Sequence, residues 1–168
     1  MILIVNTTSD EAITDTIRQH LNAARVTADI VEAGTLNISH CIGCNHCWLK
    51  TPGECAVKDD YEEILKKIVH ADQLWVISDT ALGFINHKGK NIFDRVIPII
   101  TMNLCFKKKE MRHVKRYKKN ANVGLIFKGE ADGDFLNRWM ERVALNLGSK
   151  SLGAFKESEV KEALSCMC

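Results

Sequence analysis

Four of the seven cysteines fall within the stretch CIGCNHCWLKTPGEC. Cys41, Cys44 and Cys47 are spaced at every third residue, so a tight loop turns their side chains toward one point. A Pro-Gly turn signal then folds Cys55 back toward the first three. Four thiolates supplied by one short segment suit a [4Fe–4S] cluster. The first hypothesis for this stretch is therefore a metal centre.

Other chemistries of the same cysteines remain open from the residues alone. Structural zinc usually uses two separated Cys-x-x-Cys pairs, which makes the three-plus-one spacing less natural for zinc. Cys44 and Cys47 have the spacing of a redox dithiol. Cysteine also packs well as a small buried hydrophobic residue, which would give the loop no chemistry at all.

The composition predicts a single domain over residues 1–168, because 46% hydrophobic residues in a chain of this length form one core. No apolar run reaches the roughly 18 residues of a membrane span, and the opening MILIVNTTSD lacks the features of a signal peptide. We therefore expect a soluble, cytoplasmic protein with no membrane partner. A reducing compartment disfavours a structural disulfide among the clustered cysteines.

Positive charge is concentrated between Lys107 and Lys119, where eight Lys or Arg residues and one Glu give a local charge of +7. Since the whole chain carries +2, the remainder carries about −5. Two interpretations stay open: a solvated helix face or loop, or a landing site for a phosphorylated ligand or an acidic partner. Tyr117 is the only aromatic residue among these charges, and nucleic-acid surfaces usually carry several on which bases stack. No nucleic-acid partner is therefore expected.

Five apolar runs predict strands, and the segments between them show helical periodicity or helix start signals. The expected strands are 2–5, 26–31, 73–78, 121–127 and 150–155, and the expected helices are 10–24, 60–68, 91–100 with a kink at Pro98, 135–147 and 158–164. Thr8 or Ser9 is the expected N-cap of the first helix. Alternating strands and helices predict an α/β fold, a three-layer doubly wound five-stranded parallel sheet.

Ligands of such sheets bind beyond the carboxyl ends of the strands. The loops that matter are therefore 6–13, 79–89 and 128–134. The first of these loops offers hydroxyls and backbone amides at a helix N-terminus, an arrangement that holds phosphate. Its candidate phosphate ligands are Thr7, Thr8, Ser9 and Thr14. Asp10 and Glu11 place negative charge beside them.

With these residues the sequence resembles the flavodoxin-like NAD(P)H-dependent FMN reductase superfamily, and within it the iron–sulfur flavoprotein branch. The family's cysteine cluster ends in Gly-x-Cys and precedes an acidic pair, matched here by Gly53 and the pair 59–60. Its Lys-x-x-x-Asp-Arg stretch is matched by Lys90, Asp94 and Arg95. Length and element order agree over essentially the whole chain.

The resemblance implies a strand order of 2-1-3-4-5, FMN as cofactor, and a homodimer or homotetramer that completes the flavin site. It also implies a [4Fe–4S] cluster, NAD(P)H or a protein as electron donor, and a small molecule or protein as acceptor. The expected flavin contacts outside the first loop are Thr80, Ala81, Leu82, Gly83, Phe84, Lys128 and Gly129.

Two other functions stay open. One is a flavodoxin-like domain that has lost FMN and serves as a binding or metal-sensing module, favoured by the acidic residues of the first loop and by Ala81, where the family has tyrosine. The other is a flavin reductase without a cluster.

Overall fold

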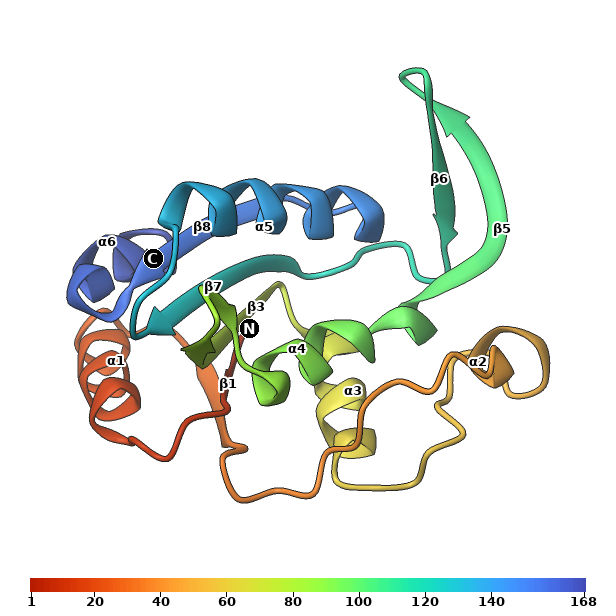
Figure 1. Ribbon diagram of the computed structural model, residues 1–168. Helices are drawn as coiled ribbons and strands as arrows, with labels where there is room; N and C mark the ends of the chain where they lie inside the picture. The colour runs from red at the N-terminus through yellow and green to blue at the C-terminus, as the bar shows by residue number, and fades with distance from the viewer.

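Five segments form a central parallel sheet in the computed structural model, which describes residues 1–168 (Figure 1). The strands are β1 (Ile2–Asn6), β2 (Ala28–Glu32), β3 (Gln73–Ala81), β7 (Asn122–Lys128) and β8 (Ser151–Lys156). Their order is β2-β1-β3-β7-β8, and every neighbouring pair is parallel. The predicted order 2-1-3-4-5 is confirmed. The short strand β4 (Phe84–Ile85) returns antiparallel to β3.

Helices cover both faces of this sheet and complete the three layers. The helices are α1 (Ala12–Ala23), α2 (His46–Leu49), α3 (Tyr61–His70), α4 (His87–Asp94), α5 (Gly133–Leu147) and α6 (Val160–Ser165), with 3-10 turns η1 (Ile97–Ile99) and η2 (Glu157–Glu159). Helices α1 and α6 pack on one face, whereas α3, α4 and α5 pack on the other. None of these helices combines the length and apolar character needed to cross a membrane.

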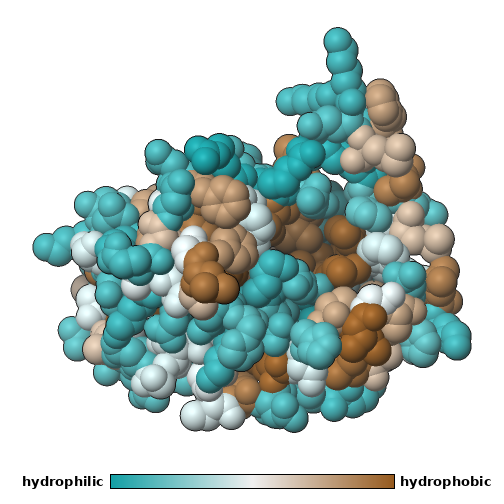
Figure 2. All heavy atoms as spheres, in the orientation of Figure 1, coloured by the Kyte–Doolittle hydropathy of each residue, from teal (hydrophilic) through white to brown (hydrophobic).

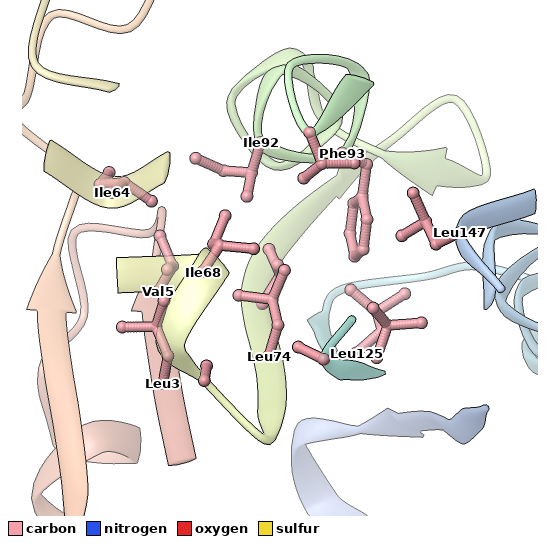
Figure 3. Close-up of a cluster of buried hydrophobic side chains, with 14 of the residues drawn as sticks. Leu3, Val5, Ile64, Ile68, Leu74, Ile92, Phe93, Leu125 and Leu147 are labelled. Carbon is pink, nitrogen blue, oxygen red and sulfur yellow. The ribbon is translucent and has the colours of Figure 1, made fainter. Parts of the chain in front are cut away.

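The alternation of side chains along β1 supplies both halves of the core. Ile2 and Ile4 point into the cluster under α1 and α6. Leu3 and Val5 point into the larger cluster on the opposite face, whose packing Figure 3 shows. Because each fully buried aliphatic side chain stabilises the fold by about 1.5–3 kcal/mol, strands buried on both sides anchor the sheet.

Gly124 of β7 gives the Trp75 indole of β3 its place in the core. The two residues are paired across the strands, and a Cβ atom at Gly124 would overlap the indole ring. Trp75 is completely buried, and its Nε1 donates to Gln73 Oε1 at 2.8 Å. The absence of a side chain at Gly124 therefore leaves room in the sheet for Trp75, its largest buried side chain.

The segment after α4 differs from the prediction. The helix expected over 91–100 ends at Asp94, η1 contains Pro98, and strand β5 (Ile100–Lys107) begins directly afterward. With β6 (Glu110–Lys115) it forms an antiparallel hairpin that projects from the body (Figure 1). The basic stretch is therefore largely part of a hairpin rather than a helix face. Mixed apolar and basic residues on an exposed strand pair lack the period-2 pattern that would have revealed it.

We predict that Gly124→Ala lowers the free energy of unfolding by about 1–3 kcal/mol, because the new methyl group forces the Trp75 ring from its site. Urea denaturation followed by circular dichroism measures this. Gly133→Ala is the matched control: its Cβ would meet only Phe127 Cζ at 3.9 Å. Equal stability of the two variants would contradict the prediction.

Candidate functional site

Three of the four predicted phosphate ligands are buried with their hydroxyls already bonded within the chain. Thr7 Oγ1 donates to the carbonyl of Ile77 at 2.8 Å. Thr8 Oγ1 donates to Asn6 Oδ1 at 2.8 Å. Thr14 Oγ1 donates to a backbone carbonyl three residues earlier, also at 2.8 Å. In this conformation the three hydroxyls stabilise the loop and are not presented to an incoming anion.

An ion pair occupies the approach to this loop. Asp10 pairs with Lys128, the last residue of β7, and its Oδ1 also accepts from Ala12 N at 2.9 Å. The hydrogen bond from Lys128, with that from Ala12, holds the pKa of the Asp10 carboxyl below its usual value. The expected N-cap at Thr8 or Ser9 is wrong: α1 begins at Ala12, and Asp10 supports its first turn. Ser9 is exposed.

The loop after β3 is a two-residue turn between β3 and β4. Ala81 pairs with Phe84, and the turn residues Leu82 and Gly83 have φ values of 53° and 76°. Positive φ at both positions indicates the type I′ geometry that matches strand twist. Leu82 is fully exposed, and the Cα of Gly83 faces open space. The turn therefore presents a flat apolar edge to solvent.

This turn is held against the loop after β7. Gly83 forms an isolated bridge with Ala131, and Thr80 Oγ1 donates to the carbonyl of Lys128 at 3.3 Å. Gly129 has a φ of 109°, and a side chain there would overlap Thr80. The structure therefore brings the predicted residues 80–84 and 128–129 together at the carboxyl edge of the sheet, which we call the crest. A cavity of about 160 Å³ lies between Thr7, residues 33–38 and the start of α4, and residues 80–84 and 128–129 are not part of its lining.

The four predicted metal ligands gather in the loop between β2 and α3. Cys47 lies in α2, while Cys41, Cys44 and Cys55 lie in the flanking loop. Burial raises the pKa of the Cys47 thiol, and the charges of Cys55, Cys41 and Cys44 raise it further. The four thiols therefore lie in one loop and influence one another electrostatically.

The structure shows no metal site among these cysteines. No three His, Cys, Asp or Glu side chains are arranged to hold a metal ion.

Arg95 is completely buried and ties the end of α4 to this cysteine loop. Its Nη1 forms an ion pair with Asp59 Oδ2 at 2.6 Å. Its Nη2 donates to Cys55 Sγ at 3.4 Å and to the carbonyl of Val57 at 3.1 Å. Burial disfavours the charged guanidinium, but the hydrogen bonds to Asp59 and Cys55 prevail and raise the Arg95 pKa. A cationic donor therefore points at one of the four sulfurs.

Hydrogen bonds from several residues hold the Asp59 carboxylate in place. It accepts from Ser39 N at 2.8 Å and from Tyr61 N at 3.1 Å, and the Arg95 guanidinium lies 4.6 Å above the Tyr61 ring. Burial would raise the Asp59 pKa, but the hydrogen bonds from Arg95 and Ser39 hold it below its usual value. Asp59 of the acidic pair 59–60 thus contacts Arg95 of the Lys-x-x-x-Asp-Arg stretch. Lys90 and Asp94 pair separately on the surface of α4.

The base of the hairpin closes the other side of the cysteine loop. Arg116 Nη2 donates to the carbonyl of Cys47 at 3.4 Å, and its Nε donates to the carbonyl of Pro98 at 2.9 Å. Trp48 Nε1 donates to the carbonyl of Ile97 at 3.1 Å, and its ring lies 5.1 Å from that of His113. Sequence reasoning missed these contacts, because they depend on a hairpin it did not anticipate.

The cysteine loop and the crest lie at opposite ends of α4. Asn86 caps the helix at the crest, where its side chain accepts from Gly89 N, and Arg95 follows the other end. None of the hydrogen bonds of residues 41–55 reaches the crest loops. An apolar cleft of about 570 Å³ opens between the hairpin and the body beside Trp48, and Figure 2 shows hydrophobic atoms in this notch. The cysteines are therefore not adjacent to the crest within one chain.

Two curated proteins are similar in sequence to part of this chain. An iron–sulfur flavoprotein of Methanocaldococcus jannaschii is 33% identical over 86 residues, 49% of this chain and 44% of the relative. An iron–sulfur flavoprotein of Archaeoglobus fulgidus is 35% identical over 68 residues, 40% of this chain and 32% of the relative. The chain resembles the iron–sulfur flavoproteins. The matched part spans less than half the length of either relative.

A solved structure resembles the fold over 99% of this chain. Megasphaera elsdenii flavodoxin superposes with a TM-score of 0.57 at 13% identity, covering 99% of this chain and 98% of that one. The flavodoxin-like fold is therefore confirmed. No family model matches the sequence.

We predict that Asp59→Asn lowers the free energy of unfolding by about 3–5 kcal/mol, because it leaves the Arg95 guanidinium buried without a countercharge. Asp94→Asn, which breaks an exposed pair, should cost at most about 1 kcal/mol. Urea denaturation at neutral pH measures both.

The dependence on pH distinguishes this charge effect from a simple change of shape. Because the folded Asp59 pKa lies below its unfolded value, its contribution is complete above the unfolded pKa and is lost as the pH falls through the folded pKa. Asp59→Asn should therefore lose less stability on acidification than the wild type. A parallel loss in both proteins would contradict the assignment.

Proposed function

We propose that this chain is an FMN-dependent redox protein of the iron–sulfur flavoprotein type, with the flavin at the crest and a [4Fe–4S] cluster on Cys41, Cys44, Cys47 and Cys55. The observation that carries the proposal is the contact of a buried cation with one of four cysteines of the same loop. Arg95 donates to Cys55 Sγ, and hydrogen bonds to cluster sulfur ligands raise the reduction potential of a centre. The names of the two relatives support the same chemistry.

Different crest residues contact different parts of FMN in this proposal. Leu82 and Gly83 offer an apolar edge on which a flat ring system rests. Lys128 offers a cation to the phosphate once it exchanges Asp10 for that ligand, and the exposed Ser9 offers a hydroxyl. The flavin supplies hydride acceptance and one-electron transfer, while the chain orients it and sets its electrostatic surroundings. No protein acid or base is required for this chemistry.

A nicotinamide nucleotide, NADH or NADPH, or a protein is the electron donor in this proposal, and a small molecule or protein is the acceptor. Because the cavity between Thr7 and α4 is small and the cysteine loop lies at the other end of α4, a second copy of the chain completes the flavin site. A homodimer or homotetramer brings the cluster of one subunit near the flavin of its neighbour.

Cluster assembly gives the direct test. Anaerobic reconstitution with ferrous iron and sulfide should produce a broad brown absorbance and about four iron atoms per chain. Cys47→Ser should lose the absorbance, whereas Cys105→Ser, at an exposed position on the hairpin, should retain it. Zinc uptake without sulfide incorporation, or an equal effect of both substitutions, would contradict the cluster.

Flavin binding gives a second, separate test. Asp10→Asn should tighten FMN binding by about tenfold, because it removes a negative charge and frees Lys128 for the phosphate. Lys128→Gln should weaken binding, and Asp15→Asn, which carries the same charge change on the exposed face of α1, should leave it unchanged. Quenching of flavin fluorescence measures the dissociation constants.

The alternative function is a flavodoxin-like domain that has lost FMN and acts as a binding or metal-sensing module. The buried threonine hydroxyls and the Asp10–Lys128 pair favour it, because they leave the phosphate loop bonded to itself. A colourless protein that fails to quench flavin fluorescence, even as Asp10→Asn, would favour this function over the first.

A further inference from the structure

A basic cavity lies between the hairpin and the carboxyl end of α5. Its volume is about 590 Å³, within the range of about 300–1,000 Å³ that is usual for small-molecule sites. Its five cationic residues are Lys107, Lys108, Arg112, Lys115 and Lys150, and no Asp or Glu lines it. The hairpin and the start of β8, distant in sequence, thus place like charges around one hollow.

The lysines of this cavity are available to a ligand. None of the four forms an ion pair with a carboxylate of the chain. Arg112 instead builds the wall: its Nη1 donates to the carbonyl of Leu145 at 3.0 Å, and it pairs with Glu110. Its Nε is buried without a partner. The cavity therefore keeps a positive potential that the chain itself does not neutralise.

The tip of the hairpin gives an independent indication. Lys108 and Lys109 form its two-residue turn with φ values of 51° and 65°. Residues other than glycine and asparagine are strained there, by roughly 1–2 kcal/mol each. The chain thus holds a lysine at the rim of the cavity at a position where glycine would be more stable. Strain of this kind is typical of functional positions.

The cavity is remote from the proposed flavin site. Lys150 directly precedes β8, and Gly148 ends α5, so both lie at the amino edge of the sheet. The crest, with Lys128, lies at the carboxyl edge. Figure 1 shows the hairpin rising at the end of β7 opposite its arrowhead. A ligand here is therefore separate from the cofactor of the crest.

We propose that this cavity binds a small molecule carrying two or more phosphate groups, of the size of a nucleoside diphosphate. Lysine ammonium groups are point charges that suit phosphate oxygens. Several phosphates are needed to engage cations from both strands of the hairpin and from Lys150 at once. The limited volume of the hollow favours a compact ligand over the extended surface of an acidic protein or a nucleic acid.

Isothermal titration calorimetry with inorganic pyrophosphate and with ADP tests the proposal on the full chain. Both probes should bind the wild type. Lys107→Gln/Lys150→Gln should weaken both by at least about tenfold, since two charge-assisted contacts are lost. Arg138→Gln/Lys161→Gln, which removes the same charge from exposed positions outside the cavity, is the matched control and should bind like the wild type.

Amide chemical shifts locate the probes. Shifts on adding pyrophosphate should concentrate in residues 105–115 and 148–150, and the double variant should lose them while its other resonances stay in place. Equal weakening by the control variant would overturn the proposal, because it would indicate a general charge effect. Absence of binding by either phosphate probe, or binding only of an acidic peptide or an oligonucleotide, would overturn it as well. None of these outcomes depends on whether flavin or a cluster is bound.

Discussion

The ion pair between Arg95 and Asp59 is the interaction on which the cysteine loop depends. A guanidinium withdrawn from water is tolerated only with a countercharge and hydrogen-bond partners, and the chain supplies these from Asp59, Cys55, Val57 and Ser39. Every partner lies in the loop, whereas the cation belongs to the end of α4. The loop has little regular structure of its own, so this polar cluster substitutes for a hydrophobic core in fixing its path.

The parallel sheet was predictable because its signals are local. A strand buried on both faces is a continuous apolar run, and alternation with helices fixes connection and handedness. The hairpin was not predictable, because its strands mix apolar and cationic residues without the alternation of a half-buried strand. Cys105 lies on this hairpin and is exposed. At the chain end, Met167 is buried in the core cluster under α1 and α6.

The site was predictable in its parts and less so in its arrangement. Spacing indicated that the cysteines would gather, and fold topology indicated which loops would form the crest. The partners that adjust these groups come from far along the chain. Asp10 and Lys128 are 118 residues apart, and Cys47 and Arg116 are 69 residues apart. No window of sequence contains both members of such pairs. The Thr7 hydroxyl likewise bonds to a carbonyl 70 residues away, whereas the hydroxyls of Thr8 and Thr14 bond to partners within three residues.

Helix α4 joins the two ends of the molecule where chemistry is expected. Its eight residues span about 12 Å, from the Asn86 cap beside Ser78 at the crest to the Arg95 contact with the cysteine loop. A short helix shifts as a rigid rod, so a displacement along its axis alters both contacts at once. Thermodynamic linkage then requires reciprocity: whatever effect occupancy of one end has on affinity at the other is returned by the same factor.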